Sequence, residues 1–217
     1  MKRFQVFVSS TYTDLIKERK EVIQALLELD CIPVGMELFP ATNNDQWSLI
    51  KELIEESDYY ILIIGGRYGS LNNMGISYTQ MEYEYANQIK IPTISFLPKT
   101  PGDISISKTD KDAIKQQKLE EFKELVSQKL IKYWTTPEDL GSVVSRSLVK
   151  LIKTTPRTGW VKANTISSSE ANLEILQLKD KILKLEKLIE TQEVQNTDSL
   201  AQGDDKIKIK YIYQKLT

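Results

Sequence analysis

Tyr59-Tyr-Ile-Leu-Ile-Ile-Gly65 is the stretch that decides the fold, and Gly66-Arg-Tyr-Gly-Ser70 follows it directly. A run of apolar and β-branched residues closed by paired glycines is typical of a strand buried on both faces, at the centre of a parallel sheet. In the next segment Ser77 and Gln80 have the spacing of a capping box, so a helix is expected to begin there. We therefore expect a central strand, a turn and a helix in this order.

The helix carries two carboxylates, which its periodicity separates. Its apolar stripe consists of Tyr78, Met81, Tyr85, Ala86 and Ile89. At roughly 100° per residue, Glu82 lies about 40° from the centre of this stripe, whereas Glu84 falls on the polar side. A carboxylate drawn towards the sheet is costly unless it is paired or has a chemical task. Glu82 is therefore the candidate functional acid, and an ion pair with a nearby Arg or Lys is the alternative.

Composition limits the possible functions. The chain has 217 residues, 41% of them hydrophobic, which is enough for one core and an extension. Its 29 basic and 30 acidic residues argue against nucleic-acid binding through a global basic surface. The single cysteine, Cys31, leaves no internal disulfide. Because histidine is absent, Ser-His and Cys-His pairs and the commonest zinc ligand are excluded, and we expect neither a metal nor a cofactor.

The first residues enter a strand directly, and no apolar run approaches the ~18 residues of a membrane span. We therefore expect a cytoplasmic protein that makes no membrane contact. Any chemistry must use carboxylates, hydroxyls, Arg or Lys.

Strands and helices alternate along the chain. Strands are expected at residues 4–9, 32–38, 59–64, 91–97 and 130–134, and helices at 14–29, 46–56, 77–89, 112–128 and 136–153. This alternation predicts an α/β fold, a flavodoxin-like, doubly wound, five-stranded parallel sheet with strand order 2-1-3-4-5.

In that order, the carboxyl ends of the first and third strands border a switch-point crevice. The first strand brings Ser9, Ser10, Thr11 and Tyr12 to this edge. The third strand brings Arg67 and Tyr68, the helix after it brings Glu82, and the loop at 39–45 approaches from the side. The sequence therefore predicts that separate polar stretches converge on one site.

Beyond residue 155 the composition changes. We assign residues 1–155 to the α/β domain, 156–169 to a polar linker, 170–195 to a coiled-coil helix and 196–217 to a tail in which 206–213 alternate as an edge strand would. The helix has apolar residues at spacings of three and four: Ile175, Leu178, Ile182, Leu185 and Ile189. Ile at one core position and Leu at the other favour a parallel dimer, so a homo-oligomer through residues 170–193 is expected, and packing back on the domain is the alternative.

Several motifs together carry a family resemblance. They are Val6-Phe-Val-Ser-Ser-Thr-Tyr-Thr-Asp-Leu15, Glu18-Arg-Lys-Glu-Val22, Gly65-Gly-Arg-Tyr-Gly-Ser70 and Ser77-Tyr-Thr-Gln-Met-Glu-Tyr-Glu-Tyr-Ala86. Over about residues 3–155 the chain resembles the "VFVSST" (DUF4062-type) domain of unknown function, a TIR-like group found in bacterial defence and signalling proteins.

The resemblance implies an activity. Many TIR-like domains hydrolyse NAD+ or convert it to a cyclised or conjugated ADP-ribose signal, and their catalytic Glu, on the helix after the third strand, is commonly followed four residues later by a small residue. Glu82 and Ala86 are similar to that pattern, but the Trp-Cys pair often found before that Glu is replaced by Gln80-Met81. The resemblance thus implies an NAD+-processing enzyme of anti-phage defence that is activated by association. It also implies a second defence protein as a partner.

Further site residues are expected around NAD+. Ser9, Ser10 and the following amides are candidates for holding a phosphate or ribose, and Arg67 for pairing with the pyrophosphate or with Glu82. Candidates for substrate contact also include Thr11 and four aromatic residues: Tyr12, Trp47, Tyr68 and Tyr78. Ser9 and Ser10 as strand ends and Trp47 as a core residue are the structural alternatives.

Two other functions remain open. A TIR-like interaction module without catalysis is the first. A nucleoside deoxyribosyltransferase-like enzyme is the second, and it needs another acid in the crevice, for which Asp14 and Asp45 are the candidates.

Overall fold

The computed structural model describes residues 2–35, 46–162 and 169–198. Its centre is a five-stranded sheet with the order β2-β1-β3-β4-β5, and every neighbouring pair is parallel. The strands are β1 (Gln5–Ser10), β2 (Ile32–Val34), β3 (Tyr59–Ile63), β4 (Thr93–Pro98) and β5 (Ile131–Trp134). The flavodoxin-like fold and the predicted strand order are therefore confirmed.

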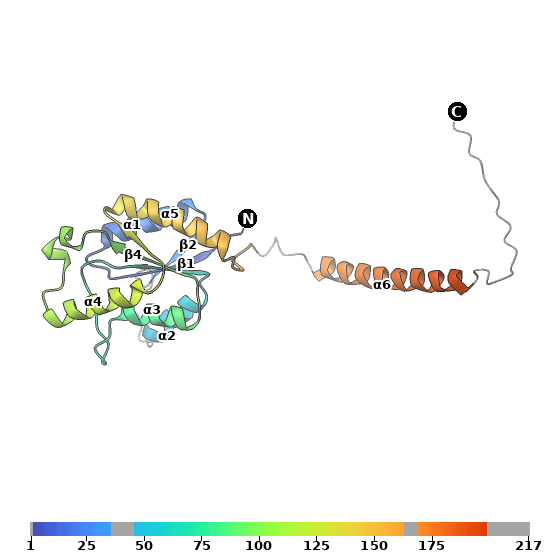
Figure 1. Ribbon diagram of the computed structural model, residues 1–217, viewed down its shortest axis with the longest axis horizontal. Coiled ribbons are helices and arrows are strands. Elements are labelled where there is room, and N and C mark those ends of the chain that lie inside the picture. The colour runs from blue at the N-terminus through green and yellow to red at the C-terminus, as the bar shows by residue number, and fades with distance from the viewer. Residues whose placement is uncertain (1, 36–45, 163–168, 199–217) are drawn as a thin grey trace, which may run out of the picture. The chain divides into compact units, whose positions relative to one another are not determined.

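Helices cover both faces of the sheet. α1 (Ile16–Glu28) and α5 (Pro137–Thr154) lie on one face, and α2 (Gln46–Glu55), α3 (Tyr78–Gln88) and α4 (Ala113–Ser127) lie on the other (Figure 1). Between β4 and α4 the chain makes two short 3-10 turns, η2 (Pro101–Asp103) and η3 (Ile106–Lys108). The sequence predicted only a polar, irregular segment there.

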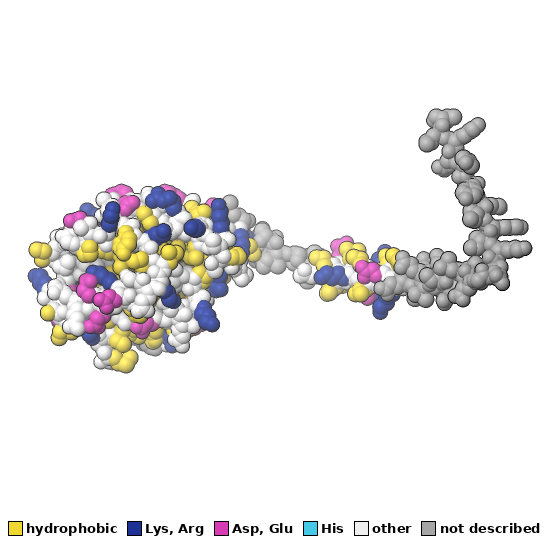
Figure 2. All heavy atoms as spheres, viewed as in Figure 1, with side chains coloured by type: hydrophobic (Ala, Val, Ile, Leu, Met, Phe, Trp, Pro, Cys, Tyr) yellow, Lys and Arg dark blue, Asp and Glu magenta, His cyan; other side chains and the backbone are white. Residues whose placement is uncertain are grey.

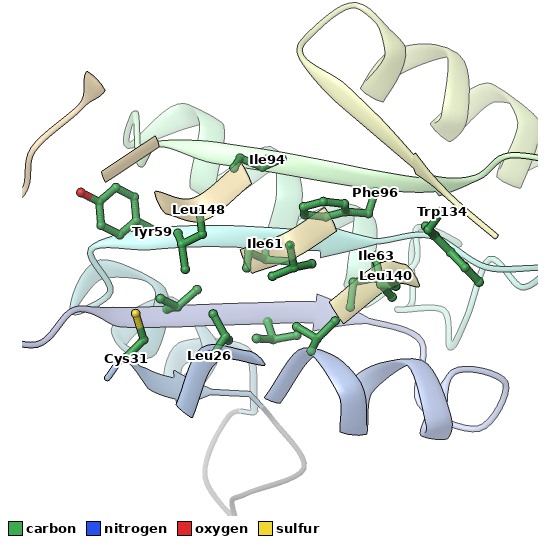
Figure 3. Close-up of a cluster of buried hydrophobic side chains, with 14 of the residues drawn as sticks. Leu26, Cys31, Tyr59, Ile61, Ile63, Ile94, Phe96, Trp134, Leu140 and Leu148 are labelled. Atoms are coloured by element: carbon green, nitrogen blue, oxygen red, sulfur yellow. The ribbon is translucent and has the colours of Figure 1, made fainter. Parts of the chain in front are cut away.

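The sheet separates two hydrophobic cores. In the core beneath α1 and α5, Tyr59, Ile61 and Ile63 of β3 pack against helix residues such as Leu26 and Leu148, and Trp134 closes the end near Leu140 (Figure 3). Tyr60 and Leu62 face the other core, with α2, α3 and α4. Because successive strand residues point to opposite faces, both faces of β3 are apolar and all of its residues are buried.

The start of α3 is fixed by its cap. Ser77 has extended backbone angles, and its hydroxyl accepts a hydrogen bond from the Gln80 amide at 3.1 Å. In a full capping box the Gln80 side chain would also bind the backbone N–H of Ser77. Here the Gln80 side chain instead accepts a hydrogen bond from the Tyr68 hydroxyl at 2.6 Å and donates one to Glu84 at 2.7 Å. The cap fixes where the helix begins, and Gln80 ties it to the turn after β3.

The compact α/β unit continues to Lys162, beyond the predicted boundary at 155. Arg3 and Trp160 form an antiparallel bridge, with N–H to O distances of 2.8 and 2.7 Å. Gly159 adds a hydrogen bond from its amide to Asp58 at 2.9 Å. The first part of the predicted linker therefore packs on the domain, because its backbone is paired with the residues that precede β1.

α6 (Ser169–Asp198) belongs to a separate unit. Its large apolar side chains are exposed, and on its visible side they lie among charges of both signs (Figure 2). None of the described helices is long and apolar enough to cross a membrane. The predicted loop at 39–45 and the predicted strand at 206–213 lie outside the described residues.

Candidate functional site

A cavity of about 380 Å³ lies at the carboxyl ends of β1 and β3. It contains five of the residues that the sequence predicts for the site, together with Glu82: Ser10, Thr11, Tyr12, Arg67 and Tyr78. The volume is in the range of small-molecule sites. The end of β1, the turn after β3 and α3 thus meet at one place, as the predicted strand order requires.

Glu82 is the buried acid of this cavity. It lies on the sheet-facing side of α3 with a relative exposure of 7%, and the Ser9 hydroxyl donates a hydrogen bond to its Oε2 at 2.5 Å. Short bonds of this kind are typical of a hydroxyl on an ionised carboxylate. Ser9 stands opposite Leu62 in the β1–β3 register, so the sheet itself holds the donor.

Tyr60 is a site residue that the sequence analysis missed. Its ring is fully buried and stacks on Phe7, with the ring centroids 5.6 Å apart. Burial, and then the negative charge of Glu82, raise the pKa of Tyr60 well above its usual value, whereas the Ser9 hydroxyl lowers it by less. Tyr60 therefore lies close enough to Glu82 for the charge of Glu82 to act on it, and its own hydroxyl is buried without a hydrogen-bond partner among the described residues. The signal in the sequence is the period of two along β3, which sends Tyr60 to the face of Ser9.

The buried face of α3 is not the predicted stripe. Glu82, Tyr83 and Ala86 are its buried residues, whereas Tyr85 is only partly buried. Tyr83 packs edge-on against Phe122 of α4, with centroids 5.7 Å apart. Glu82 is buried on the sheet side, as expected of a carboxylate drawn towards the sheet, and Glu84 is exposed as predicted.

Arg67 spans the rim of the cavity. Its guanidinium donates to Thr13 Oγ1 at 3.0 Å and to the Ser107 carbonyl at 2.8 Å, so it joins the turn after β1 to the segment after β4. The adjacent Gly69 has a φ of +101°, and a Cβ there would lie 3.0 Å from Thr11 Cγ2. The positive φ favours a glycine, and a side chain here would also press on Thr11.

The turn after β1 is held from beneath by a buried arginine. Arg19 donates to Ser10 Oγ at 2.6 Å and to the Val8 carbonyl at 3.2 Å. Ser10 Oγ in turn donates to the Thr11 carbonyl at 2.7 Å. The ring of Tyr12 is exposed at the cavity. The serine pair is therefore anchored by side-chain contacts in addition to the end of its strand.

Two predicted aromatic residues lie away from the cavity lining. Trp47 of α2 packs edge-on against Tyr85 at 5.9 Å and joins the core on that face. Tyr68 is buried against Phe122, and its hydroxyl donates to Gln80. Both therefore occupy structural positions, whereas Tyr12 and Tyr78 present their rings to the cavity.

Asp110 and Lys115 also line the cavity and were not predicted. Asp110 accepts a hydrogen bond from the Tyr68 amide at 2.7 Å, and Lys115 donates to the Gly69 carbonyl at 3.1 Å. Both come from the segment around the start of α4, which carries no recognisable motif. Their approach depends on the path of the 3-10 turns, which a sequence pattern does not reveal.

The donor set indicates the chemistry that this site can perform. Among the described residues, no group of three or more Cys, Asp or Glu side chains is arranged to hold a metal ion. A buried carboxylate on the floor and two cationic side chains, Arg67 and Lys115, suit a ligand with hydroxyls at one end and negative charge at the other.

Comparisons with known proteins identify a family. A family model described as "Domain of unknown function (DUF4062)" matches residues 5–149. No curated protein matches the chain.

Solved structures similar to this chain include the following three. The TIR domains of the activated Roq1 resistosome, which directly recognises the pathogen effector XopQ, are 16% identical, with 82% of this chain and 98% of that chain covered and a TM-score of 0.39. A short-chain flavodoxin associated with a non-canonical PDU bacterial microcompartment is 11% identical, with 69% of this chain and 98% of that chain covered and a TM-score of 0.32. The diflavin flavoprotein A3 of Nostoc sp. is 16% identical, with 69% of this chain and 97% of that chain covered and a TM-score of 0.32. These scores are low, so the fold class rests on the strand order.

Proposed function

The chain belongs to the DUF4062 family, a domain of unknown function. For this member of the family, we propose the function of a TIR-like enzyme that cleaves NAD+. The products are ADP-ribose or a cyclised or conjugated form of it. The proposal includes a cytoplasmic role in bacterial defence against phage, which rests on the resemblance of the sequence motifs to TIR-like defence proteins.

The observation that carries the proposal is the Ser9–Glu82 pair. A carboxylate that is 7% exposed and accepts a hydroxyl at 2.5 Å is held in one position at the floor of a cavity. A fixed negative charge in a water-poor site stabilises positive charge that develops in a transition state. Cleavage of a glycosidic bond develops such a charge at the anomeric carbon.

The remaining lining residues suit the other parts of NAD+. Arg67 and Lys115 supply positive charge for the pyrophosphate, because guanidinium and ammonium groups bind phosphate oxygens. Tyr12 and Tyr78 supply ring faces for stacking. Thr11 also lines the cavity, and its hydroxyl is a further candidate for contact with a ribose or phosphate oxygen.

The proposed reaction breaks the bond between the ribose C1′ and the nicotinamide nitrogen. The electron pair of this bond goes to nicotinamide, which leaves as a neutral ring and needs little protonation. Glu82 holds the ribose hydroxyls and stabilises the cationic sugar until water attacks C1′ and loses a proton to solvent. A nucleophilic group of the same or another nucleotide in place of water gives the cyclised or conjugated product.

The direct test is nicotinamide release from NAD+ by the purified full chain, at high protein concentration, for wild type, Glu82→Gln and Glu84→Gln. We expect Glu82→Gln to lose at least about 100-fold of the rate, because it removes the charge that stabilises the transition state. Glu84 is exposed on the opposite side of the same helix, so Glu84→Gln controls for the helix and is expected to retain the wild-type rate.

Other outcomes would contradict the proposal. Equal rates for wild type and Glu82→Gln would remove Glu82 from catalysis. No release by folded, associated wild type would favour the interaction module. A transferase would instead exchange bases between deoxynucleosides; Asp14, one candidate for its second acid, lines a different cavity, whereas Asp110 lines this one.

A further inference from the structure

A second cavity, of about 260 Å³, lies at the same edge of the sheet. It is enclosed by the beginning of α1, the ends of β3, β4 and β5, and the segment of the 3-10 turns, and it shares no lining residue with the Glu82 cavity. Trp134 forms its inner wall at the end of the core that Figure 3 shows. This cavity has no role in the proposed cleavage of NAD+.

Buried polar groups without partners gather in this cavity. Asp14, Glu18 and Trp134 have relative exposures of only 2%, 4% and 5%. Among the described residues, both Asp14 carboxylate oxygens, Glu18 Oε2 and Trp134 Nε1 are buried without a hydrogen-bond partner. Such groups are rare in native proteins because each one loses its water without replacement. Here several of them line one space, so a shared ligand accounts for them.

The charges around the cavity are unbalanced. Lys108 pairs with Glu18, with 2.8 Å between Nζ and Oε1, and leaves Oε2 free of partners. No such contact is made to Asp14. Burial raises the pKa of the Asp14 carboxyl; the Thr11 hydroxyl, the backbone amide of Asp14 itself and the charges of Arg67 and Lys108 lower it by less. Asp14 is therefore a buried acid of this cavity whose oxygens have no hydrogen-bond partner among the described residues, and a cation beside it would stabilise its ionised form.

Gly65 leaves room for the Asp14 carboxylate. A Cβ at position 65 would lie 2.8 Å from Asp14 Oδ2 and 2.9 Å from Leu15 Cδ2, so a side chain there would displace the ends of both side chains. The end of β3 thus leaves space that the carboxylate of Asp14 occupies. The carboxylate is therefore a buried part of the cavity lining.

The geometry points to a binding site for a small organic cation, an alkylammonium or guanidinium compound, in the cavity of Asp14, Glu18 and Trp134. The N–H groups of such a cation satisfy the carboxylate oxygens of Asp14 and Glu18, and its charge balances Asp14. Apolar wall atoms of Leu15 and Ile104 accommodate a short alkyl chain. A second polar group on the ligand can accept the indole N–H of Trp134.

The test uses the full chain, 1-butylammonium as the probe and 1-butanol as its uncharged counterpart. The readout is the NMR resonance of the Trp134 indole N–H, which is identified by its absence in Trp134→Phe. We expect a saturable shift of this resonance with 1-butylammonium and none with 1-butanol. Asp14→Asn is expected to weaken binding at least about tenfold, because it removes the buried charge that the ammonium contacts.

Two further variants separate this site from others. Asp103 lines the same cavity but is exposed, so Asp103→Asn is expected to keep the affinity within about threefold. Glu82→Gln is expected to bind as wild type does, so binding can succeed or fail independently of NAD+ cleavage. The inference is overturned by the absence of a saturable shift in wild type, by equal binding of 1-butanol, or by undiminished binding to Asp14→Asn. The 1-butanol comparison needs no variant and holds even if a variant folds poorly.

Discussion

At the scale of single residues, the contact between Ser9 and Glu82 links the stability of the domain to its proposed activity. A buried carboxylate needs donors, and Ser9 supplies one from the centre of the sheet at 2.5 Å. The side chain of Tyr60, beneath the pair, keeps its proton because burial and the charge of Glu82 both raise its pKa. The Ser9 hydroxyl therefore orients the carboxyl group of Glu82 from the sheet, and Tyr60 stays a neutral phenol beside it.

Replacing Ser9 by Ala tests this link. We expect the free energy of unfolding to fall by about 1–3 kcal/mol, because a buried carboxylate loses a donor. Nicotinamide release is expected to fall with it by about tenfold, as Glu82 is no longer held in one orientation. Thermal unfolding and the release assay measure the two effects.

Ser95→Ala is the matched control. Ser95 is as deeply buried as Ser9 and lies on β4, on the same face of the sheet. A loss of activity in Ser95→Ala as large as in Ser9→Ala would mean that a small buried void, and not the bond to Glu82, lowers the rate.

The residues of the site were predictable to different degrees. Ser10, Thr11 and Arg67 follow strands that neighbour each other in the predicted order, so topology alone placed them at one edge. Glu82 followed from the period of its helix. Asp110 and Lys115 come from a segment whose path depends on tertiary contacts, such as the bond of Asp110 to the Tyr68 amide, and no local pattern marks them.

At the scale of elements, α3 connects the sheet to the cavity, and its first turn fixes the position of Glu82. Its buried face differs from the apolar stripe because α3 packs against α4 through Tyr83 and Phe122 as well as against the sheet. The spacing of apolar residues in a helix predicts which side packs on the sheet. It does not reveal that a second element, here α4, also packs against the helix. The helix itself was predictable, whereas its rotation was not.

Ser77→Ala removes the cap of α3. We expect a loss of about 1 kcal/mol of stability, because the Gln80 amide loses its partner. Activity is also expected to fall severalfold, since fraying of the first turn displaces Glu82. Chemical denaturation and the release assay distinguish the two contributions.

Thr136→Ala is a comparable change at another helix. Thr136 caps α5 by accepting from the Asp139 amide at 3.2 Å, on the face of the sheet opposite α3. It should cost similar stability and leave the rate unchanged. Equal losses of activity in both variants would show that global destabilisation explains the effect.

At the scale of the whole molecule, α6 is an amphipathic element whose apolar side chains, including Ile175, Leu178 and Ile182, are exposed. An isolated helix gains little stability in water, and a heptad pattern buries its apolar stripe by association. We propose that α6 joins copies of the chain and that association raises the activity of the α/β domain. The sequence indicated the helix; the state of association stays a prediction.

Leu178→Glu combined with Ile182→Glu tests this association. We expect the double variant to be monomeric in sedimentation experiments, because charges replace both the Ile and the Leu core positions, and to release nicotinamide more slowly. Leu183→Glu is the control, since Leu183 is 56% exposed, as Ile182 is at 54%, but lies off the heptad stripe. A double variant that associates as wild type does would contradict the proposed seam.

The overall architecture was predictable for a physical reason. Alternating strands and helices of these lengths, with right-handed crossovers, leave few topologies, and the order β2-β1-β3-β4-β5 is the simplest of them. Residues 157–162 were different. Their sequence is typical of a polar linker. Their structure depends on backbone pairing between Trp160 and Arg3, which are too far apart in the sequence for a local pattern to reveal the contact.

The bridge between Arg3 and Trp160 has a consequence for the construction of larger proteins. The polypeptide enters and leaves the α/β domain at one point, beside the amino end of β1 and away from the edge that carries Glu82. A module with adjoining ends can be inserted into a surface turn of a host protein, or given new ends by circular permutation, without stretching its scaffold. The adjoining ends of this domain therefore suit it to insertion or circular permutation at a point away from the edge that carries Glu82.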